Sequence, residues 1–177
     1  MEIPNITLRE LEKTDLPVLT AWRSDPERVG LLGAGFRYVG TSADEAWYAG
    51  YLANRSNNVR LAICAPEGTM VGVVYLLHID WVSRDAEFAI WIGEPAERGK
   101  SYGKRAMQQT ISHAFEDLNL ERLHLAVLVH NKRAIGLYRK LGFRDEGVLR
   151  RAAYKRGAHH DLLLMGLLRT EYVRRAS

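Results

Sequence analysis

Residues 86–118 read AEFAIWIGEPAERGKSYGKRAMQQTISHAFEDL. Their first part, 87–92, is rich in β-branched and aromatic residues, which favour a half-buried or central strand. The segment 98–105 then places four cations and two glycines within eight residues. Beyond it, side chains recur at the spacing of one helix face, at Ala106, Met107, Thr110, Ile111, Ala114, Phe115 and Leu118. The stretch therefore predicts a strand, a basic glycine-bearing loop and an amphipathic helix.

A glycine loop between a strand and the first turn of a helix is a typical binding site for phosphate. The first-turn N–H groups have no partner within the helix, the helix dipole is positive there, and glycine lets the backbone approach an anion. The spacing excludes a P-loop, because Gly99 and Gly103 have three residues between them and Arg105, not a hydroxyl residue, follows Lys104. A dinucleotide-binding G-x-G-x-x-G is also absent from the sequence.

Two segments resemble the GNAT acetyltransferase superfamily. The loop is similar to the acyl-CoA pyrophosphate loop, [RQ]-x-x-G-x-[GA], with Arg98 and Gly103 at matching positions and Ser101 in place of the first glycine. A serine there is strained if its φ is positive. The segment 131–143, NKRAIGLYRKLGF, is similar to the N-x-x-A-x-x-x-Y-x-x-x-G-F motif and follows a predicted strand. By the order and spacing of these segments the chain is identified as a member of the superfamily.

The remaining pattern predicts the elements in chain order. Thr14 or Asp15 is expected to cap the first helix, the S-x-x-E box beginning at Ser42 the second, and Asn131 the fourth, which ends at Gly142. The resemblance implies an α/β (α+β) fold: a mixed, mostly antiparallel seven-stranded sheet flanked by four helices and splayed between strands 4 and 5, where CoA enters. The expected strands are 5–11, 59–65, 70–79, 87–92, 122–129, 143–153 and 161–168, and the expected helices are 14–24, 42–51, 106–118 and 131–142.

At 177 residues the chain is expected to form one acetyltransferase domain spanning 1–177. No apolar run is long enough to cross a membrane and the first residues lack the pattern of a signal peptide, so a cytoplasmic location is expected. Cys64 is the only cysteine, which excludes an internal disulfide and a cysteine-based metal cluster. The net charge of +4 fits an anionic cofactor, although a nucleic-acid surface would give the same total.

The resemblance implies direct acetyl transfer from acetyl-CoA to an amine, with no covalent enzyme intermediate. The ammonium must lose a proton before attack, the developing oxyanion needs an N–H donor, and the departing thiolate needs a proton. Tyr138, at the position of the family's helix tyrosine, is the candidate proton donor, and core packing is its alternative role. Glu87 is the candidate base, directly or through water, and its alternative role is a solvated carboxylate paired with Arg84.

The resemblance also implies which residues bind acetyl-CoA. The N–H groups of 90–92 are expected along the pantetheine arm, with one near Ala89 or Ile90 serving the acetyl oxygen. No metal is expected, because the adjacent His159 and His160 point to opposite faces of a strand and no third ligand has suitable spacing. The full set expected at the cofactor is Ile90, Trp91, Ile92, Arg98, Gly99, Lys100, Ser101, Tyr102, Gly103, Lys104, Asn131, Ala134 and Tyr138.

Finer details resemble the branch that holds ribosomal-protein alanine, spermidine and nucleotide-aminosugar acetyltransferases; segments 22–26 and 146–150 and Asp161 carry this likeness. We therefore expect an N-acetyltransferase acting on a primary amine of a small molecule or protein N-terminus. An acyl-CoA-binding module without transferase activity is the alternative. A nucleic-acid-binding protein is disfavoured, because the chain lacks an interleaved aromatic and basic face.

Two surface features are expected on the closing strands. The sheet edge formed by 143–153 and 161–168 predicts a homodimer, because an unprotected edge invites pairing. A basic patch near the expected acceptor entrance is typical of a solvated hairpin, with binding of an acceptor's phosphate as the alternative. The patch consists of Arg150, Arg151, Lys155 and Arg156.

Overall fold

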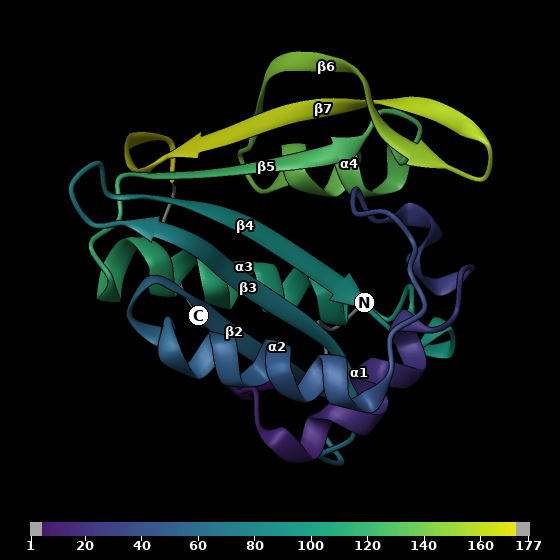
Figure 1. Cartoon of the computed structure of the whole chain (residues 1–177). Coiled ribbons are helices and arrows are strands. Elements are labelled where there is room, and N and C mark those ends of the chain that lie inside the picture. The colour runs from purple at the N-terminus through teal and green to yellow at the C-terminus, as the bar shows by residue number, and fades with distance from the viewer. Residues whose placement is uncertain (1–4, 173–177) are drawn as a thin grey trace.

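In the computed structural model, which describes residues 5–172, seven strands form one sheet in the order β1-β2-β3-β4-β5-β7-β6 (Figure 1). Every neighbouring pair is antiparallel except β4 and β5, which are parallel. The predicted mixed sheet, with its parallel pair between strands 4 and 5, is confirmed. The strands are β1 Thr7–Glu10, β2 Val59–Cys64, β3 Met70–Asp80, β4 Asp85–Ile92, β5 Arg122–Leu128, β6 Arg144–Lys155 and β7 Ala158–Leu168.

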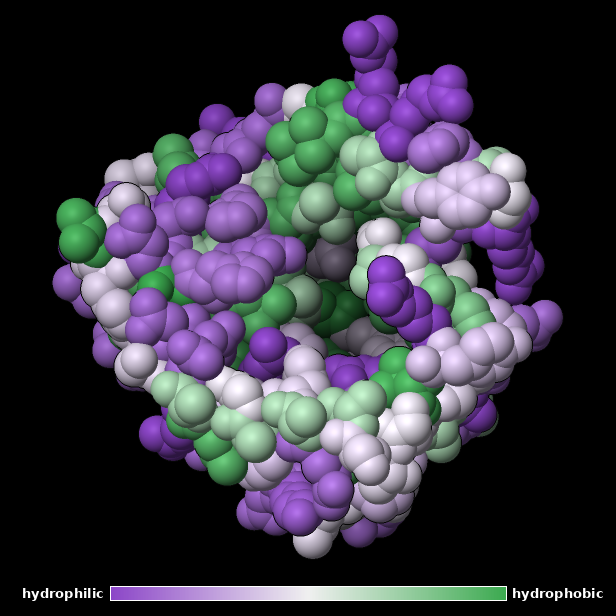
Figure 2. Space-filling view, in the orientation of Figure 1, coloured by the Kyte–Doolittle hydropathy of each residue, from purple (hydrophilic) through white to green (hydrophobic). Residues whose placement is uncertain are grey.

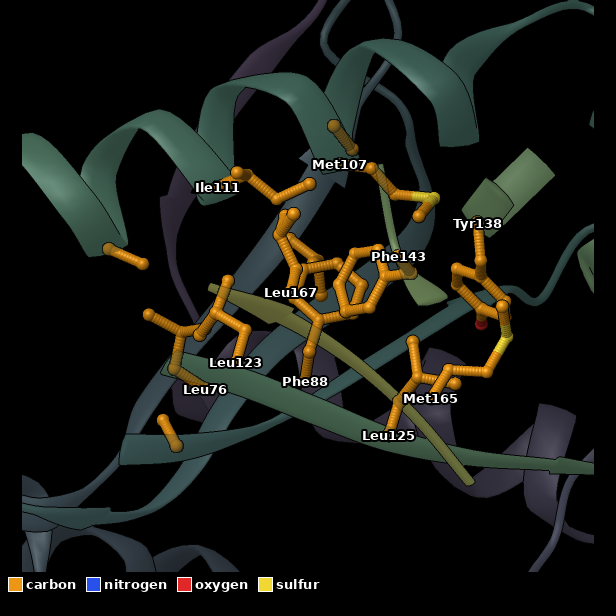
Figure 3. Packing of buried hydrophobic residues seen from close by; sticks show 14 of the residues in the cluster. Leu76, Phe88, Met107, Ile111, Leu123, Leu125, Tyr138, Phe143, Met165 and Leu167 are labelled. Atoms are coloured by element: carbon orange, nitrogen blue, oxygen red, sulfur yellow. The ribbon is translucent and has the colours of Figure 1, made fainter. Parts of the chain in front are cut away.

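Four α-helices within residues 5–172 cover the two faces of the sheet, as predicted. The helices α3 (Tyr102–Ser112) and α4 (Lys132–Lys140) bury their apolar faces in the main core, where Met107 and Ile111 lie over strand residues such as Phe88 (Figure 3). The helices α1 (Leu16–Arg23) and α2 (Thr41–Ala53) close a second, smaller core on the opposite face. This core contains Leu16, Leu19 and Trp22 of α1 with Ala62, Cys64 and Val73 of the sheet.

The predicted cap of the second helix is wrong, and the first helix has its predicted N-cap residue but no side-chain cap. The helix α2 begins at Thr41, with Gly40 at its N-cap and no side-chain cap, because the Glu45 carboxylate pairs with Lys13 at 3.2 Å instead of turning back to the helix end. Asp15 stands at the N-cap of α1, but its carboxylate accepts the Glu12 N–H at 2.8 Å and does not cap the helix. The Asp15 carboxylate also pairs with Arg9 at 2.7 Å, so each of the two carboxylates has a cationic partner.

The hairpin that ends the sheet is longer than predicted. Lys155 and Ala158 still pair, so only Arg156 and Gly157 form the turn, with positive φ angles of 48° and 83°. Two positive φ angles in succession give the tight turn that matches the twist of paired strands. The register also breaks between Leu149 and Ala153, so β6 bends along its length.

A close contact fixes α1 against the end of β4. A Cβ atom on Gly93 would lie 2.2 Å from the Trp22 ring, which no side chain could tolerate without movement. The same ring packs edge-on against Trp91 with the centroids 5.7 Å apart. The second core therefore holds the carboxyl end of β4 in place, which is where the functional site begins.

Candidate active site

The two central strands part after a short paired segment. Pairing between β4 and β5 extends only from Asp85 to Glu87 and from Arg122 to His124, and β5 continues against β7. Beyond Glu87 the edge of β4 that faces β5 has no strand partner, and alternate N–H groups there remain free for a ligand. The space-filling view shows a hollow over this divergence, with hydrophobic colours in its depth (Figure 2).

The basic loop reaches α3 through two residues with positive φ. Gly99 has a φ of 94° and Ser101, the N-cap residue, has a φ of 68°. No side chain caps α3, so no capping side chain accepts a hydrogen bond from the N–H groups of its first turn. Free backbone N–H groups at a helix start, reached through residues in the left-handed region, can bind an anion. The loop therefore fits the pyrophosphate of CoA.

Some cations near the loop hold its backbone in place, and others have no carboxylate partner within the described residues. Arg98 donates from Nε to the Ile92 carbonyl at 3.2 Å, and Lys100 pairs with Glu97 at 2.8 Å, so these two side chains hold the loop itself. Lys104 forms no ion pair with any residue in 5–172. Arg133, at the start of α4, brings its guanidinium to 3.4 Å from the position of a Cβ on Gly99. The two segments that carried the family resemblance thus meet at one basic surface, and Arg133 is a residue that the sequence reasoning missed.

Ser101→Gly should raise the free energy of unfolding by about 0.5–1 kcal/mol. A residue with a Cβ is destabilised by roughly 1–2 kcal/mol in the left-handed region, and glycine avoids this strain. The greater flexibility of glycine in the unfolded chain offsets roughly 0.5–1 kcal/mol of the stabilisation. Urea unfolding of the purified variant measures the difference. Ser101→Ala is the control, since it keeps the Cβ; equal stabilities of the two variants would contradict the assigned strain.

Tyr138 lies in α4 on the core side of the sheet. Its ring is buried and packs against Phe143 with the centroids 5.8 Å apart, and its hydroxyl is directed toward the sheet beside Met165 (Figure 3). Within 5–172 the hydroxyl makes no hydrogen bond, and desolvation raises its pKa to about 12. The hydroxyl is therefore protonated at neutral pH, as a proton donor must be. Asn131, two turns earlier, caps α4 by accepting the Ala134 N–H at 3.2 Å, as predicted.

Glu87 lies on the opposite face of the sheet. Its neighbours Ala86 and Phe88 are buried in the main core with Tyr138, and alternation along a strand turns Glu87 the other way. The carboxylate is 39% exposed and lies 3.2 Å from Nδ1 of His78. The predicted alternative, an ion pair between Glu87 and Arg84, is wrong, because Arg84 pairs with Glu121 at 3.0 Å. The candidate acid and the candidate base therefore approach the strand divergence from opposite sides.

The loop between α1 and α2 bridges the two halves of the splayed sheet. Arg28 donates to the Gly93 carbonyl at 3.1 Å, at the end of β4. From the other half, the ammonium of Lys155 in β6 donates to the carbonyls of Val29, at 3.1 Å, and Ala34. The solvated role predicted for Lys155 is wrong, because this side chain is buried, which lowers the pKa of its ammonium. Nothing in the local sequence distinguishes Lys155 from its exposed basic neighbours.

Lys155→Met should raise KM for the amine acceptor by about tenfold and leave KM for acetyl-CoA unchanged. Methionine fills a similar volume, so the fold is retained, but the two hydrogen bonds from a charged donor to the loop are lost. Steady-state kinetics with each substrate varied in turn measures the split. Arg150→Met removes an exposed cation from the same hairpin and should change neither constant. An equal rise in KM for both substrates would show that Lys155 has a general structural role.

Two features are absent from residues 5–172. No helix in this part of the chain is long and apolar enough to span a membrane. No three His, Cys, Asp or Glu side chains in the same range lie together as a metal site. His159 and His160 have separate neighbours, since His159 bonds to the Arg151 carbonyl at 3.1 Å and His160 contacts the ring of His130.

Comparison with known proteins identifies relatives over nearly the whole chain. Residues 5–144 match the acetyltransferase (GNAT) domain family. The chain is 26% identical to a spermidine N(1)-acetyltransferase of Vibrio cholerae over 181 residues, covering 97% of both proteins. It is 35% identical over 106 residues to a putative ribosomal N-acetyltransferase of Bacillus subtilis, covering 60% of this chain and 57% of that protein.

A solved structure has the same fold. The spermidine N-acetyltransferase from Vibrio cholerae in complex with CoA and spermine superposes with a TM-score of 0.89 at 27% identity, covering 94% of this chain and 97% of that one. The family match, the sheet that divides between β4 and β5, and the uncapped start of α3 agree with one another. The chain therefore belongs to the GNAT acetyltransferase family and is an enzyme that transfers the acetyl group of acetyl-CoA to an amine.

Proposed function

We propose that Glu87 and Tyr138 perform the two proton transfers of this acetylation. The amine nitrogen, after losing a proton to Glu87 directly or through water, attacks the acetyl carbon as the carbon–sulfur bond breaks. His78, at 3.2 Å from Glu87 and largely exposed, carries the proton on to solvent. Tyr138 gives its hydroxyl proton to the departing thiolate, and the second proton that the nitrogen loses as the amide forms returns through water to the tyrosinate. The observation that carries this proposal is the buried hydroxyl of Tyr138, which has no hydrogen-bonding partner within 5–172.

The proposed cofactor site follows the free edge of β4 to the start of α3. The N–H groups of 90–92 bind the pantetheine arm, and one near Ala89 or Ile90 binds the acetyl oxygen. The loop from Arg98 to Lys104 holds the pyrophosphate with its backbone N–H groups, while Arg98 and Lys100 keep the loop ordered. Arg133 and Lys104 supply the positive charge, and Asn131 and Ala134 set the start of α4 beside the cofactor.

The acceptor in this proposal is a primary amine of a small molecule or of a protein N-terminus. The experiment supplies acetyl-CoA with a panel of polyamines, aminosugars and N-terminal peptides and follows the free thiol of released CoA. Polyamines belong in the panel because the similar Vibrio cholerae protein is a spermidine N-acetyltransferase. Amine-dependent thiol release supports transfer, whereas binding of acetyl-CoA with no thiol release from any amine supports a binding module.

We also propose that the protein is a cytoplasmic homodimer of one-domain subunits, joined along β6. This strand is the edge of the sheet, and it leaves Val148 and Leu149 about half exposed. An exposed edge with apolar side chains is a natural surface for a second copy.

Light scattering should give twice the monomer mass, and Val148→Lys combined with Leu149→Lys should reduce it to the monomer mass. The paired substitution places charge on the proposed interface without touching the buried core. A wild-type monomer at all concentrations would contradict the proposed assembly.

A further inference from the structure

A cavity of about 730 Å³ lies between the α1–α2 loop and the tip of the β6–β7 hairpin. Its loop wall includes Val29, Leu31 and Phe36, and its far wall includes His130 and His160. His130 immediately precedes Asn131, the cap of the helix that carries Tyr138. Arg28 ties the same loop to Gly93 at the carboxyl end of β4. The cavity is therefore positioned at the end of the sheet where β4 and β5 diverge, beside the α1–α2 loop.

The charged side chains around this cavity are mostly cationic. Besides the two histidines, its wall contains the basic Lys155 and Arg156 and the acidic Glu27. Lys155 is 8% exposed, and its hydrogen bonds go to two carbonyls, so within 5–172 no carboxylate neutralises it. Arg156 lies beside Gly30, with its guanidinium 3.9 Å from the position of a Cβ there, and forms no ion pair within the same range.

Such a charge distribution favours a ligand with negative charge. A buried cation without a counter-charge is costly, and a phosphate or carboxylate that enters the cavity compensates it. A polyamine would instead add positive charge beside two cations, with Glu27 as the sole carboxylate of the wall among the described residues. A cavity built for a polycation needs the opposite balance of charge.

We propose that this cavity binds an acceptor that carries a phosphate or carboxylate besides its primary amine, with Arg156 as the residue that contacts the anionic group. This inference narrows the acceptor class and rests on the proposed function. The aromatic and aliphatic wall residues pack against the body of the acceptor, and the planar guanidinium suits a bidentate contact with the anion.

The test measures binding separately from catalysis. Calorimetry on the full-length protein saturated with CoA compares glucosamine 6-phosphate with glucosamine, 4-aminobutyrate with its amide, and spermidine. The anionic member of at least one pair should bind about tenfold more tightly than its neutral partner and more tightly than spermidine. Arg156→Gln should remove this preference, Arg156→Lys should retain part of it, and Glu27→Gln should strengthen it. Arg150→Gln, on the exposed part of the hairpin, should leave it unchanged.

The outcomes distinguish a failure of the anionic-acceptor inference from a failure of the proposed function. Tighter binding of spermidine than of both anionic amines, or an unchanged preference in Arg156→Gln, would overturn the anionic-acceptor inference even if amines are acetylated. An intact preference without thiol release from acetyl-CoA would leave the inference standing and refute the proposed proton-transfer roles. If Arg156→Gln fails to fold, Glu27→Gln, which removes the negative charge of the wall, decides the matter alone: weaker binding of the anionic amines to that variant contradicts the inference.

Discussion

Tyr138→Phe is expected to lower kcat by about 10²–10⁴-fold while KM for acetyl-CoA stays near its wild-type value. The substitution keeps the ring that packs against Phe143 and removes only the hydroxyl, so the loss reports general-acid catalysis. The proposed pyrophosphate contacts lie at the start of α3, away from this hydroxyl, which is why cofactor affinity should hold. Steady-state rates, combined with a pre-steady-state measurement of the chemical step, provide the test.

The matched control for this result is Glu87→Gln. It should abolish or displace the acidic limb of the pH–rate profile, because the base can no longer be inactivated by protonation. The alkaline side should be unchanged in both proteins, since the pKa of Tyr138 is raised to about 12 and its proton is retained. If Tyr138→Phe keeps wild-type kcat while chemistry limits the rate, Tyr138 is a packing residue and water protonates the thiolate.

Gly103→Glu should reduce acetyl-CoA affinity by about 100-fold or more. The residue is the second of α3, where a carboxylate would stand against the pyrophosphate; two unit charges 4 Å apart repel by about 4 kcal/mol at an effective dielectric constant of 20. A glutamate in the first turn is favourable to the helix itself, so thermal stability should be equal or higher. Calorimetric titration with acetyl-CoA measures the affinity, and a thermal melt of the same sample measures stability.

Gly103→Ala separates charge from the mere loss of glycine. A Cβ at this position would lie 3.6 Å from the Ile92 side chain, which is an ordinary contact, so the alanine variant should bind acetyl-CoA almost normally. Unchanged affinity in a folded Gly103→Glu protein would remove the pyrophosphate from this loop.

The elements and the cofactor loop could be predicted because their signals are local. A strand, a glycine-bearing basic loop and an amphipathic face are adjacent in the sequence, and Asn131 caps the helix that it begins. The start of the second helix, and the partner of the Asp15 carboxylate at the first, could not be predicted in the same way. The carboxylates involved prefer the Glu12 amide and the Lys13 ammonium, and the packing of α1 and α2 decides those contacts.

The acceptor side was largely beyond sequence reasoning, since distant segments build it. Lys155 resembles the arginines around it in the sequence, yet it alone of this patch is buried. His78 contacts Glu87 because a bulge with a φ of 52° interrupts β3 after Leu77. No periodic pattern marks such a residue, and its role depends on the strand beside it.

The anchoring of the α1–α2 loop also has a consequence for how the protein matures. The contacts of Lys155 with Val29 and Ala34 join residues 126 and 121 positions apart, so they form only after nearly the whole chain has been synthesised. Closing so long a segment is entropically slow, whereas the cofactor loop and α3 are assembled from neighbours in sequence. We therefore expect the loop before α3 and the helix itself to become ordered earlier in folding than the α1–α2 loop, which waits for Lys155.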